Sequence, residues 1–257
     1  MPSISVVVIA QNEERTIGDV LAAVLPLASE IILVDSGSAD GTVEIARGMG
    51  AQVVHQDWLG YSAQKNYAIS LASREWILSL DADEIATPDL VSEIEATIGG
   101  PRAQDFDGFR IPRLLIIGEK PVEHGGFYPD AQLRLFRRGK GKFNDRFVHE
   151  AVFVDGKVGK LQHMLKHYAY RNVEEFAQAM EKYARLSTEQ SLKVGFKPWK
   201  TSKLNEALHP AWTFFYRYFL RAGYLDGELG FKLNVIYSDY VRRKIIYLRE
   251  ASCSEQS

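Results

Sequence analysis

The chain has 257 residues, of which 46% are hydrophobic, so it is long enough for one large domain or for one domain with an appendage. Its single cysteine, Cys253, lies in a polar C-terminal segment, which excludes a disulfide framework and a cysteine-based metal site. It has no run of eighteen apolar residues and no signal-peptide pattern after Met1, so a cytoplasmic protein is expected.

The net charge of −2 conceals two unlike regions. Residues 1–192 carry 20 Lys and Arg against 27 Asp and Glu, a net charge of −7. Residues 193–249 carry 11 against 4, a net charge of +7. The C-terminal quarter is therefore expected to present a different kind of surface.

The first half of the chain alternates apolar strands with amphipathic helices. Residues 4–10 are mostly β-branched and nearly all apolar, as expected for a parallel strand that is buried on both faces. Further strands are expected at 30–35, 52–54 and 75–80, and helices at 17–25, 40–50, 62–73 and 87–100. This order predicts an α/β fold, with a mostly parallel sheet and helices on both of its faces.

Three polar clusters follow three of these strands, at residues 11–14, 35–42 and 81–84. Because ligands bind beyond the carboxyl ends of parallel strands, we expect the clusters to form one site. Asp35 has the position of a residue that accepts from a base or a ribose hydroxyl, although it could also be a turn acid that bonds the backbone after it. The chain has no G-x-G-x-x-G after the first strand and no P-loop, which excludes both of those phosphate-binding motifs.

An acidic pair, Asp81 and Asp83, closes the fourth predicted strand. Side chains alternate along a strand, so we expect both carboxylates on the same side. Two carboxylates at one strand tip repel each other unless a cation lies between them, and Mg²⁺ bound to a diphosphate meets that requirement. The alternative is an acidic turn, and the polar clusters at the neighbouring strand ends favour the metal site.

Together, four segments resemble the family 2 glycosyltransferases, which are inverting enzymes of the GT-A fold that use nucleotide-sugar donors and a divalent metal. These segments are residues 8–14, 34–42, 64–66 and 80–84, in the order and spacing of that family. Residues 128–138 and 148–150 are similar to a bacterial branch that includes lipopolysaccharide core glucosyltransferases. The resemblance covers roughly residues 4–150.

The family resemblance implies which residues hold the donor. Those expected at the nucleotide-sugar are Ala10, Asn12, Glu13, Asp35, Lys65, Asp81 and Ala82. Asp35 would contact the base, Asp81 the ribose or the metal shell, and Asn12 and Glu13 would shape the base pocket. Lys65 would face the nucleotide, unless it is a solvated surface residue.

The resemblance also implies a divalent cofactor, Mg²⁺ or Mn²⁺, which Asp83 would bind against the diphosphate. Enzymes of this fold often complete the metal site with a histidine. His167 is the better placed candidate, and His149 is the other. A structural role for either histidine is the alternative.

Inverting transfer also requires a base that takes the proton from the acceptor hydroxyl. Glu150 stands where the family usually has its acidic base. Asp130 is the second candidate and Asp145 the third. Glu150 could instead pair with an arginine such as Arg134 or Arg146 and only hold its loop.

Beyond residue 170 the sequence changes character. Residues 172–175 form a capping box before an amphipathic helix, and aromatic residues then alternate with Arg and Lys from Trp199 to Tyr247. This mixture suits a membrane interface, whereas a helical appendage that packs on the domain or forms a homodimer is the alternative. Nucleic-acid binding is not expected, because the donor-site motifs already account for the protein.

We therefore expect a GT-A catalytic domain at 1–170, a helical region for membrane, acceptor or dimer contacts at 171–250, and a disordered tail at 251–257. The expected activity is inverting transfer of a hexose from a nucleotide-sugar, first of all a UDP-sugar, to a lipopolysaccharide-core or other lipid-linked acceptor. This would take place at the inner face of the cytoplasmic membrane. The alternatives are a transferase for a capsule glycan precursor or a peptide, and a non-catalytic nucleotide-sugar-binding scaffold.

Overall fold

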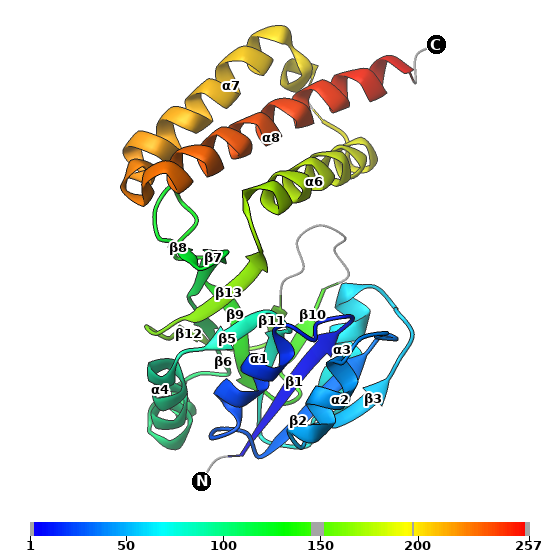
Figure 1. The fold of residues 1–257 in the computed structure, drawn as a ribbon, viewed down its shortest axis with the longest axis vertical. Helices are drawn as coiled ribbons and strands as arrows, with labels where there is room; N and C mark the ends of the chain where they lie inside the picture. The colour runs from blue at the N-terminus through cyan, green and yellow to red at the C-terminus, as the bar shows by residue number, and fades with distance from the viewer. Residues whose placement is uncertain (1–2, 145–151, 197, 255–257) are drawn as a thin grey trace. The chain divides into compact units, whose positions relative to one another are not determined.

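The computed structural model describes residues 3–144, 152–196 and 198–254 (Figure 1). The chain forms two compact units. The first unit comprises Met1–Leu114 and Asp130–His167, and the second comprises Leu115–Pro129 and Tyr168–Ser257. The segment 115–129 therefore belongs to the second unit, although it lies within the first 170 residues.

A seven-stranded sheet forms the centre of the first unit, in the order β12-β6-β9-β4-β1-β2-β3. Its strands are β1 (Ile4–Ala10), β2 (Glu30–Asp35), β3 (Gln52–His55), β4 (Trp76–Asp81), β6 (Gly108–Ile111), β9 (Gln132–Arg137) and β12 (Val158–Lys160). All neighbouring strands run parallel except β9, which is antiparallel to β4 and to β6. The predicted α/β class with a mostly parallel sheet is confirmed.

Side chains of β1 alternate between the two faces of this sheet, as the pleat requires. Val6 and Val8 belong to one apolar cluster and Val7 to another. The first cluster also contains residues of α1 (Ile17–Val24), α2 (Thr42–Gly48) and α4 (Pro88–Gly99), and the second contains residues of α3 (Tyr61–Leu71). Helices therefore cover both faces, which explains why the central strands are almost entirely apolar.

The remaining elements of the first unit are short. They are β5 (Glu84–Ala86), α5 (Arg102–Asp105), β10 (Gly141–Phe143) and β11 (Val152–Val154). Helix α4 begins where the sequence predicts, because the Thr87 hydroxyl accepts the N–H of Leu90 at 3.3 Å and Pro88 opens the first turn.

Two strands carry the chain from one unit to the other. In the first unit, β5 pairs antiparallel with the start of β13 (Leu165–Tyr170), which places His167 opposite Glu84. In the second unit, the end of β7 (Arg113–Ile117) pairs antiparallel with β8 (Lys120–Val122).

The second unit is mainly helical. Its helices are α6 (Val173–Val194), η1 (Pro198–Thr201), α7 (Lys203–Phe215), the π-helical turn η2 (Tyr216–Leu220), η3 (Gly223–Asp226) and α8 (Gly227–Ser254). Both α6 and α7 pack on α8. The Asn172 side chain caps α6 by accepting the N–H of Glu175 at 2.8 Å, as the capping box predicts. Helix α8 continues to Ser254, into the segment that the sequence suggested would be disordered.

Within the described residues, every helix is too short or too polar to cross a bilayer.

Candidate functional site

The strand register brings the predicted polar clusters to one edge of the sheet. Ala10 lies beside Asp35, Ile9 beside Asp81, and Asp35 beside His55. These are the carboxyl ends of four adjacent parallel strands, the position at which such sheets bind ligands. The predicted location of the site follows from this register.

The loops after β1 and β2 are tied together by short hydrogen bonds. Asn12, which has a positive φ of 59°, accepts the N–H of Ala39 at 2.8 Å through its side chain. The N–H of Glu13 donates to the hydroxyl of Thr42 at 2.8 Å, and the Glu14 carboxylate accepts the N–H of Gly41 at 2.9 Å. The two loops therefore form one rim at the sheet edge, with Asn12 and Glu13 in it.

Asp35 is used by the turn that follows it. Its carboxylate is buried and accepts the N–H of Gly37 at 3.0 Å and that of Ser38 at 3.1 Å. This is the turn-acid role that the sequence left open for Asp35. The carboxylate fixes the loop after β2, so a contact with a nucleotide would have to be made in addition to these bonds.

Ala10 and Ala82 contribute no side chain to the edge. Both side chains are buried in the apolar cluster that contains α1 and α4. Any contact that they make with a ligand would therefore come from their backbone groups.

Three consecutive residues of helix α3 make side-chain contacts with distant parts of the first unit. Gln64 donates to the Ser36 hydroxyl and to the carbonyl of Gln56, both at 3.0 Å. Asn66 exchanges two hydrogen bonds with the backbone of Phe143 in β10. Lys65, which is only 8% exposed, places its Nζ atom 2.7 Å from Oδ1 of Asp81. The alternative of a solvated surface lysine is therefore wrong.

The acidic pair does not share one strand. Strand β4 ends at Asp81, and Asp83 lies in the turn before β5. The two carboxylates consequently have different partners: Asp81 contacts Lys65 and arginine, whereas Asp83 contacts His167. Strand alternation therefore does not determine the relative direction of these two side chains, because the period of two does not extend into a turn.

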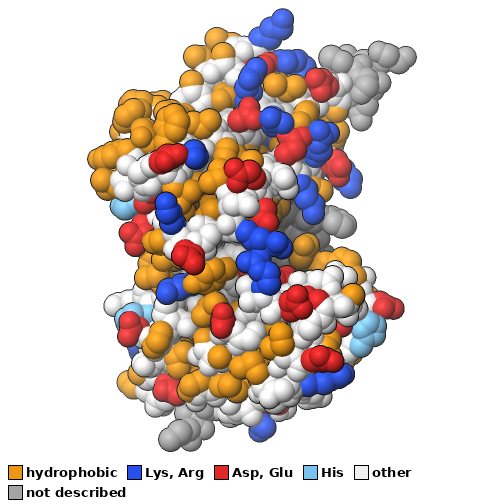
Figure 2. Space-filling model, viewed as in Figure 1, with side chains coloured by type: hydrophobic (Ala, Val, Ile, Leu, Met, Phe, Trp, Pro, Cys, Tyr) orange, Lys and Arg blue, Asp and Glu red, His pale blue; other side chains and the backbone are white. Residues whose placement is uncertain are grey.

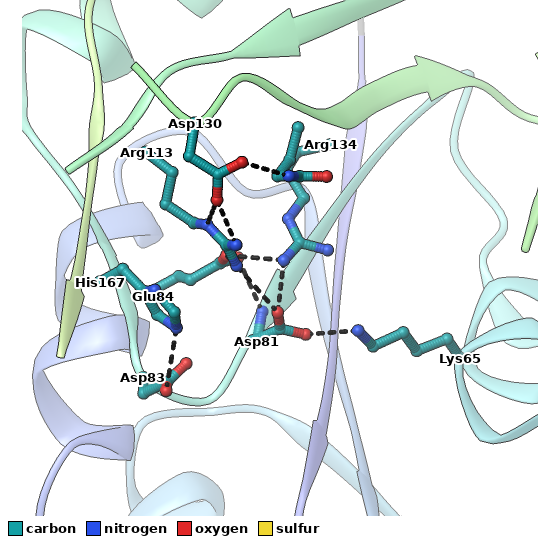
Figure 3. A network of polar contacts seen from close by, with 9 residues as sticks. Lys65, Asp81, Asp83, Glu84, Arg113, Asp130, Arg134 and His167 are labelled. Atoms are coloured by element: carbon teal, nitrogen blue, oxygen red, sulfur yellow. Dashed lines mark hydrogen bonds and ion pairs between the residues drawn. The ribbon is translucent and has the colours of Figure 1, made fainter. Parts of the chain in front are cut away.

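Asp81 lies in a network of ion pairs (Figure 3). Its Oδ2 atom accepts from Nη2 of Arg134, and Nη1 of Arg113 lies 3.9 Å away. Burial alone would raise the pKa of Asp81, but the positive charges of Arg134, Lys65 and Arg113 outweigh it and hold the pKa far below its usual value. Asp81 is therefore a fixed anion.

Glu84 is the centre of this network, and the sequence analysis did not single it out. Its side chain is fully buried, with 0% exposure. Oε1 accepts from Arg134 at 2.6 Å and from Arg113 at 3.0 Å, and Oε2 accepts the N–H of Asp81 at 3.1 Å. Glu84 thus orients both arginines and the end of β4.

Arg113 connects the network to Asp130. Its Nε donates to Oδ2 of Asp130 at 3.0 Å, and its Nη2 also contacts that oxygen. Oδ1 of Asp130 accepts from the Gln132 amide at 2.6 Å. Both oxygens of this candidate base are therefore engaged, one of them with a cation.

Asp83 and His167 form a separate pair beside the network. Their Oδ2 and Nε2 atoms are 3.3 Å apart, and each side chain is partly exposed. Neither forms an ion pair with Lys or Arg in the part of the chain that the structure describes. Burial raises the pKa of Glu13, and the negative charge of Asp83 raises it further.

Three candidates lie outside the described residues, namely Asp145, His149 and Glu150. Within the described residues, no group of three or more His, Cys, Asp and Glu side chains is arranged to hold a metal ion by itself. Asp83 and His167 supply two converging donors, so a metal held there would take its other ligands from elsewhere.

Comparison with known protein families identifies relatives of this chain. The Glycosyl transferase family 2 model matches residues 5–156, which is more than half of the chain. An uncharacterized glycosyltransferase of Rickettsia bellii (strain RML369-C) is 30% identical over 259 residues, covering 97% of this chain and 87% of the relative. The lipopolysaccharide core biosynthesis glycosyltransferase LpsC of Rhizobium meliloti (strain 1021) is 28% identical over 268 residues, covering 96% of this chain and 93% of LpsC.

Among solved structures, glucosyl-3-phosphoglycerate synthase from Mycobacterium tuberculosis, in complex with Mn²⁺, UDP and glucosyl-3-phosphoglycerate, is 27% identical. The match covers 46% of this chain and 45% of that chain, with a TM-score of 0.38. A likeness at that TM-score supports no conclusion about this chain.

Proposed function

This chain belongs to glycosyltransferase family 2, and we propose that it transfers a hexose from a nucleotide-sugar to a lipopolysaccharide-core or other lipid-linked acceptor, with inversion at the anomeric carbon. The observation that carries this proposal is the pair Asp83 and His167, beside the fixed anion Asp81, at the carboxyl edge of the sheet. The name of LpsC, which aligns with nearly the whole chain, supports the acceptor class.

For the donor, we propose that Asp81 and Lys65 face the nucleotide from the sheet edge. Lys65 is held by the 2.7 Å contact with Asp81, so its ammonium group keeps one position before the donor arrives. A positioned cation stabilises the negative charge that develops on the departing nucleoside diphosphate, because it needs little reorganisation during the reaction. Asn12 and Glu13 would border the base from the rim. A UDP-sugar is the first donor to test.

The divalent cation would be held by Asp83 and His167. These two side chains fit such an ion, because a carboxylate oxygen of Asp83 and an imidazole nitrogen of His167 lie 3.3 Å apart and could bind the same cation. Mg²⁺ commonly takes one or two protein carboxylates and completes its shell with phosphates and water, so two protein donors are sufficient. Bound there, Mg²⁺ or Mn²⁺ would neutralise charge on the diphosphate as a Lewis acid.

For the base, we propose Glu150, with Asp130 as the second candidate. The base must take a proton from the acceptor hydroxyl as that oxygen attacks the anomeric carbon. Asp130 already holds Arg113 and Gln132 with its two oxygens, which favours a role in keeping Arg113 in place. Glu150→Gln should therefore keep donor affinity and lose transfer. Surviving transfer would make Asp130 the leading base.

The direct test is donor turnover without acceptor. The protein, incubated with UDP-, GDP- and ADP-sugars and Mn²⁺, should slowly release nucleoside diphosphate from at least one donor. Asp83→Asn should lower that rate by about 100-fold or more, because charge stabilisation at the leaving group is lost. The matched control is Asp89→Asn, an exposed carboxylate in the first turn of α4, which should leave the rate unchanged.

Two further readouts separate the possible outcomes. Mn²⁺ binding, measured from the loss of the free-ion electron paramagnetic resonance signal, should weaken in Asp83→Asn and in His167→Ala. Tight donor binding with no release from any donor would contradict turnover and favour a non-catalytic nucleotide-sugar-binding scaffold. Once a donor is known, transfer to a lipopolysaccharide-core acceptor, a capsule glycan precursor or a peptide identifies the acceptor class.

A further inference from the structure

Arg217 is held in one position on the second unit by uncharged groups. Its guanidinium carbon lies 4.3 Å from the ring centre of Phe127 and 3.9 Å from that of Tyr237, and its Nε donates to the Asn234 side chain at 3.2 Å. Asn234 is itself fully buried and donates to the carbonyl of Gly230 at 2.7 Å. These contacts fix the plane of the guanidinium but do not neutralise its charge.

The outer edge of the Arg217 guanidinium is open. Nε is the only one of its nitrogens that forms a hydrogen bond within the described residues, so the N–H groups of Nη1 and Nη2 have no partner there. Neither of these two nitrogens is enclosed. Burial lowers the pKa of Arg217, and the positive charge of Arg221 lowers it further. An anion at this edge would stabilise the cation through charge-assisted hydrogen bonds.

Arg221 directs a second guanidinium to the same point. It follows η2 and is four residues from Arg217, a spacing that places both side chains on one side of the turn. An ideal Cβ placed on Gly126 would lie 3.4 Å from Nη1 of Arg217 and 3.8 Å from Nε of Arg221. Across the residues that the structure describes, no carboxylate forms an ion pair with either arginine. Two cations that face one point repel each other unless an anion lies between them.

The loop that faces the two arginines is fixed by its own contacts. Gly125 and Gly126 have positive φ angles of 66° and 76°, a conformation that favours glycine. The N–H of Gly125 donates to the carbonyl of Arg221 at 2.8 Å, and a Cβ on Gly125 would lie 2.9 Å from the Asn234 amide. The loop therefore approaches the arginines closely, and Gly126 places no side chain of its own before them.

Asp226 contacts the same loop but has another partner. Its Oδ2 accepts the N–H of His124 at 2.9 Å, and its Oδ1 lies 2.7 Å from Nδ1 of His124. The rest of this end of the unit is apolar. Phe219 and Leu220 are exposed, and Figure 2 shows hydrophobic side chains gathered over the end of α7 and the turn that follows it. The described residues thus supply no counter-charge to the two arginines.

We propose that Arg217 and Arg221, facing the Gly125–Gly126 loop, bind a phosphate group. The planar donors of arginine match phosphate oxygens in pairs. Two cations at one point favour a phosphate monoester, which carries up to two negative charges, over a carboxylate, which carries one. A guanidinium held against two rings keeps its orientation before the ligand arrives, so less conformational entropy is lost on binding.

The charge of the surrounding chain supports an anionic ligand. Residues 193–249 have a net charge of +7, which attracts anions over a longer range than the contacts themselves. A sugar phosphate and a lipid phosphate both carry the proposed group, and their relative affinities identify the source. The proposal concerns binding in the second unit and does not depend on the transfer reaction.

Isothermal titration of the full chain with inorganic phosphate tests the proposal. The wild type should bind phosphate, and Arg221→Gln should weaken binding by about tenfold or more, because a charge-assisted contact is lost. Arg217→Lys keeps the charge but not the planar donors and should weaken binding by about tenfold. In the NMR spectrum of the arginine Nε–H groups, phosphate should shift the signals that these two variants remove.

Glucose 1-phosphate and a short-chain phosphatidic acid below its critical micelle concentration distinguish the two sources. Tighter binding of the first would indicate a sugar phosphate, and tighter binding of the second a lipid phosphate. Both should bind more weakly to Arg221→Gln than to the wild type.

The control is Arg171→Gln, which removes an exposed arginine of the same unit that already pairs with Glu175 at 3.3 Å. It should bind phosphate as the wild type does. Circular dichroism should show that each variant is folded; Arg221 is exposed, so its variant decides the outcome if Arg217→Lys does not fold. The proposal is overturned if the wild type binds no phosphate, or if either folded variant binds it as tightly as the wild type. It is equally overturned if Arg171→Gln weakens binding as much.

Discussion

The two units distribute charge and apolar surface in opposite ways. The first unit buries charged side chains, among them Glu84, Lys65 and Arg134, and joins them in one network. The second unit, although smaller, contributes fourteen of the twenty large apolar side chains that the described residues expose. The first unit thus buries charged side chains, whereas the second unit exposes apolar ones.

Each arrangement lowers the free energy of unfolding relative to a unit with an apolar interior and a polar surface. Taking charges out of water costs several kcal/mol per ion, and replacing a buried network by apolar residues is often neutral or stabilising. Exposed apolar side chains forgo the roughly 25 cal/mol per Å² that burial provides. The difference teaches that stability alone explains neither the buried charges of the first unit nor the exposed apolar side chains of the second.

The same substitution in both units should give the largest contrast. Arg134→Met removes the guanidinium that contacts both Asp81 and Glu84, leaves buried Glu84 with Arg113 alone, and should lower the free energy of unfolding by about 3–5 kcal/mol. Arg217→Met removes a cation that has no carboxylate partner in the described chain. It should change the free energy by no more than about 1 kcal/mol, because lost ring contacts are offset by relief of burial.

Urea unfolding followed by hydrogen exchange would measure both variants and assign each change to its unit. Arg47→Met, at an exposed position of α2, is the control and should change the free energy by less than about 0.5 kcal/mol. Equal losses for Arg134→Met and Arg217→Met would show that the second unit also depends on a buried ion pair, and the contrast between the units would fail.

A leucine truncation should sharpen the contrast for apolar side chains. Leu80→Ala in β4, where the side chain is 1% exposed, should cost about 2–5 kcal/mol through lost burial and the cavity left behind. Leu208→Ala in α7 should stay within about 0.5 kcal/mol, since its side chain already lies in water. Denaturant titration of both variants measures the difference. A loss of several kcal/mol for Leu208→Ala would mean that this side chain supports the fold.

Removing a helix cap should lower the free energy of unfolding by a similar amount in both units. The contrast between the units therefore does not extend to helix ends. Thr87→Ala at α4 and Asn172→Ala at α6 each remove a side chain that accepts a backbone N–H, and each should cost about 1 kcal/mol. The conservative variants Thr87→Ser and Asn172→Asp keep an acceptor and should recover most of that loss in the same unfolding assay. A cap worth much more in one unit would point to a cause other than the helix end.

The sheet and the location of the site could be predicted from the sequence, because both depend on local pattern. The apolar runs at 4–10 and 30–35 define parallel strands, and their order fixes which ends meet. Once the strands are parallel, Asp35 and Asp81 must fall on the same edge. The helix start at residue 87 and the capping box at 172–175 were found for the same reason, since a helix start is recognised within four residues.

The network at that edge could not be predicted, because its partners are distant in sequence. Arg113 and Glu84 are 29 residues apart, and Arg134 and Asp81 are 53 apart. The sequence suggested Arg134 only as a possible partner of Glu150, and nothing local separates a buried arginine from a solvated one. The one available signal was Glu84 itself, an acid directly after the acidic pair, whose burial follows from its place in β5 opposite His167.

Acid should weaken the two units to different extents, and this is the smallest effect that we expect. Burial alone would raise the pKa of Glu93, but the N–H groups of His163 and Gln162 and the His163 ring hold it below its usual value of 4.5. In the second unit, the Tyr247 hydroxyl and the guanidinium groups of Arg243 and Arg185 lower the pKa of Glu181.

Both shifts have the same sign. Because the folded pKa lies below the unfolded one, each carboxylate stabilises the fold above about pH 4.5, and that contribution is lost as the pH falls further. Between about pH 6 and pH 4, Glu93→Gln and Glu181→Gln should each lose less stability than the wild type, by under about 1 kcal/mol. The difference should be smaller at high salt for Glu181, whose partners are mostly exposed, than for Glu93, whose backbone hydrogen bonds are not screened. Urea titrations at both pH values measure it, with Glu95→Gln as the exposed control; an unchanged acid dependence in Glu93→Gln would remove this carboxylate from the stability of the first unit.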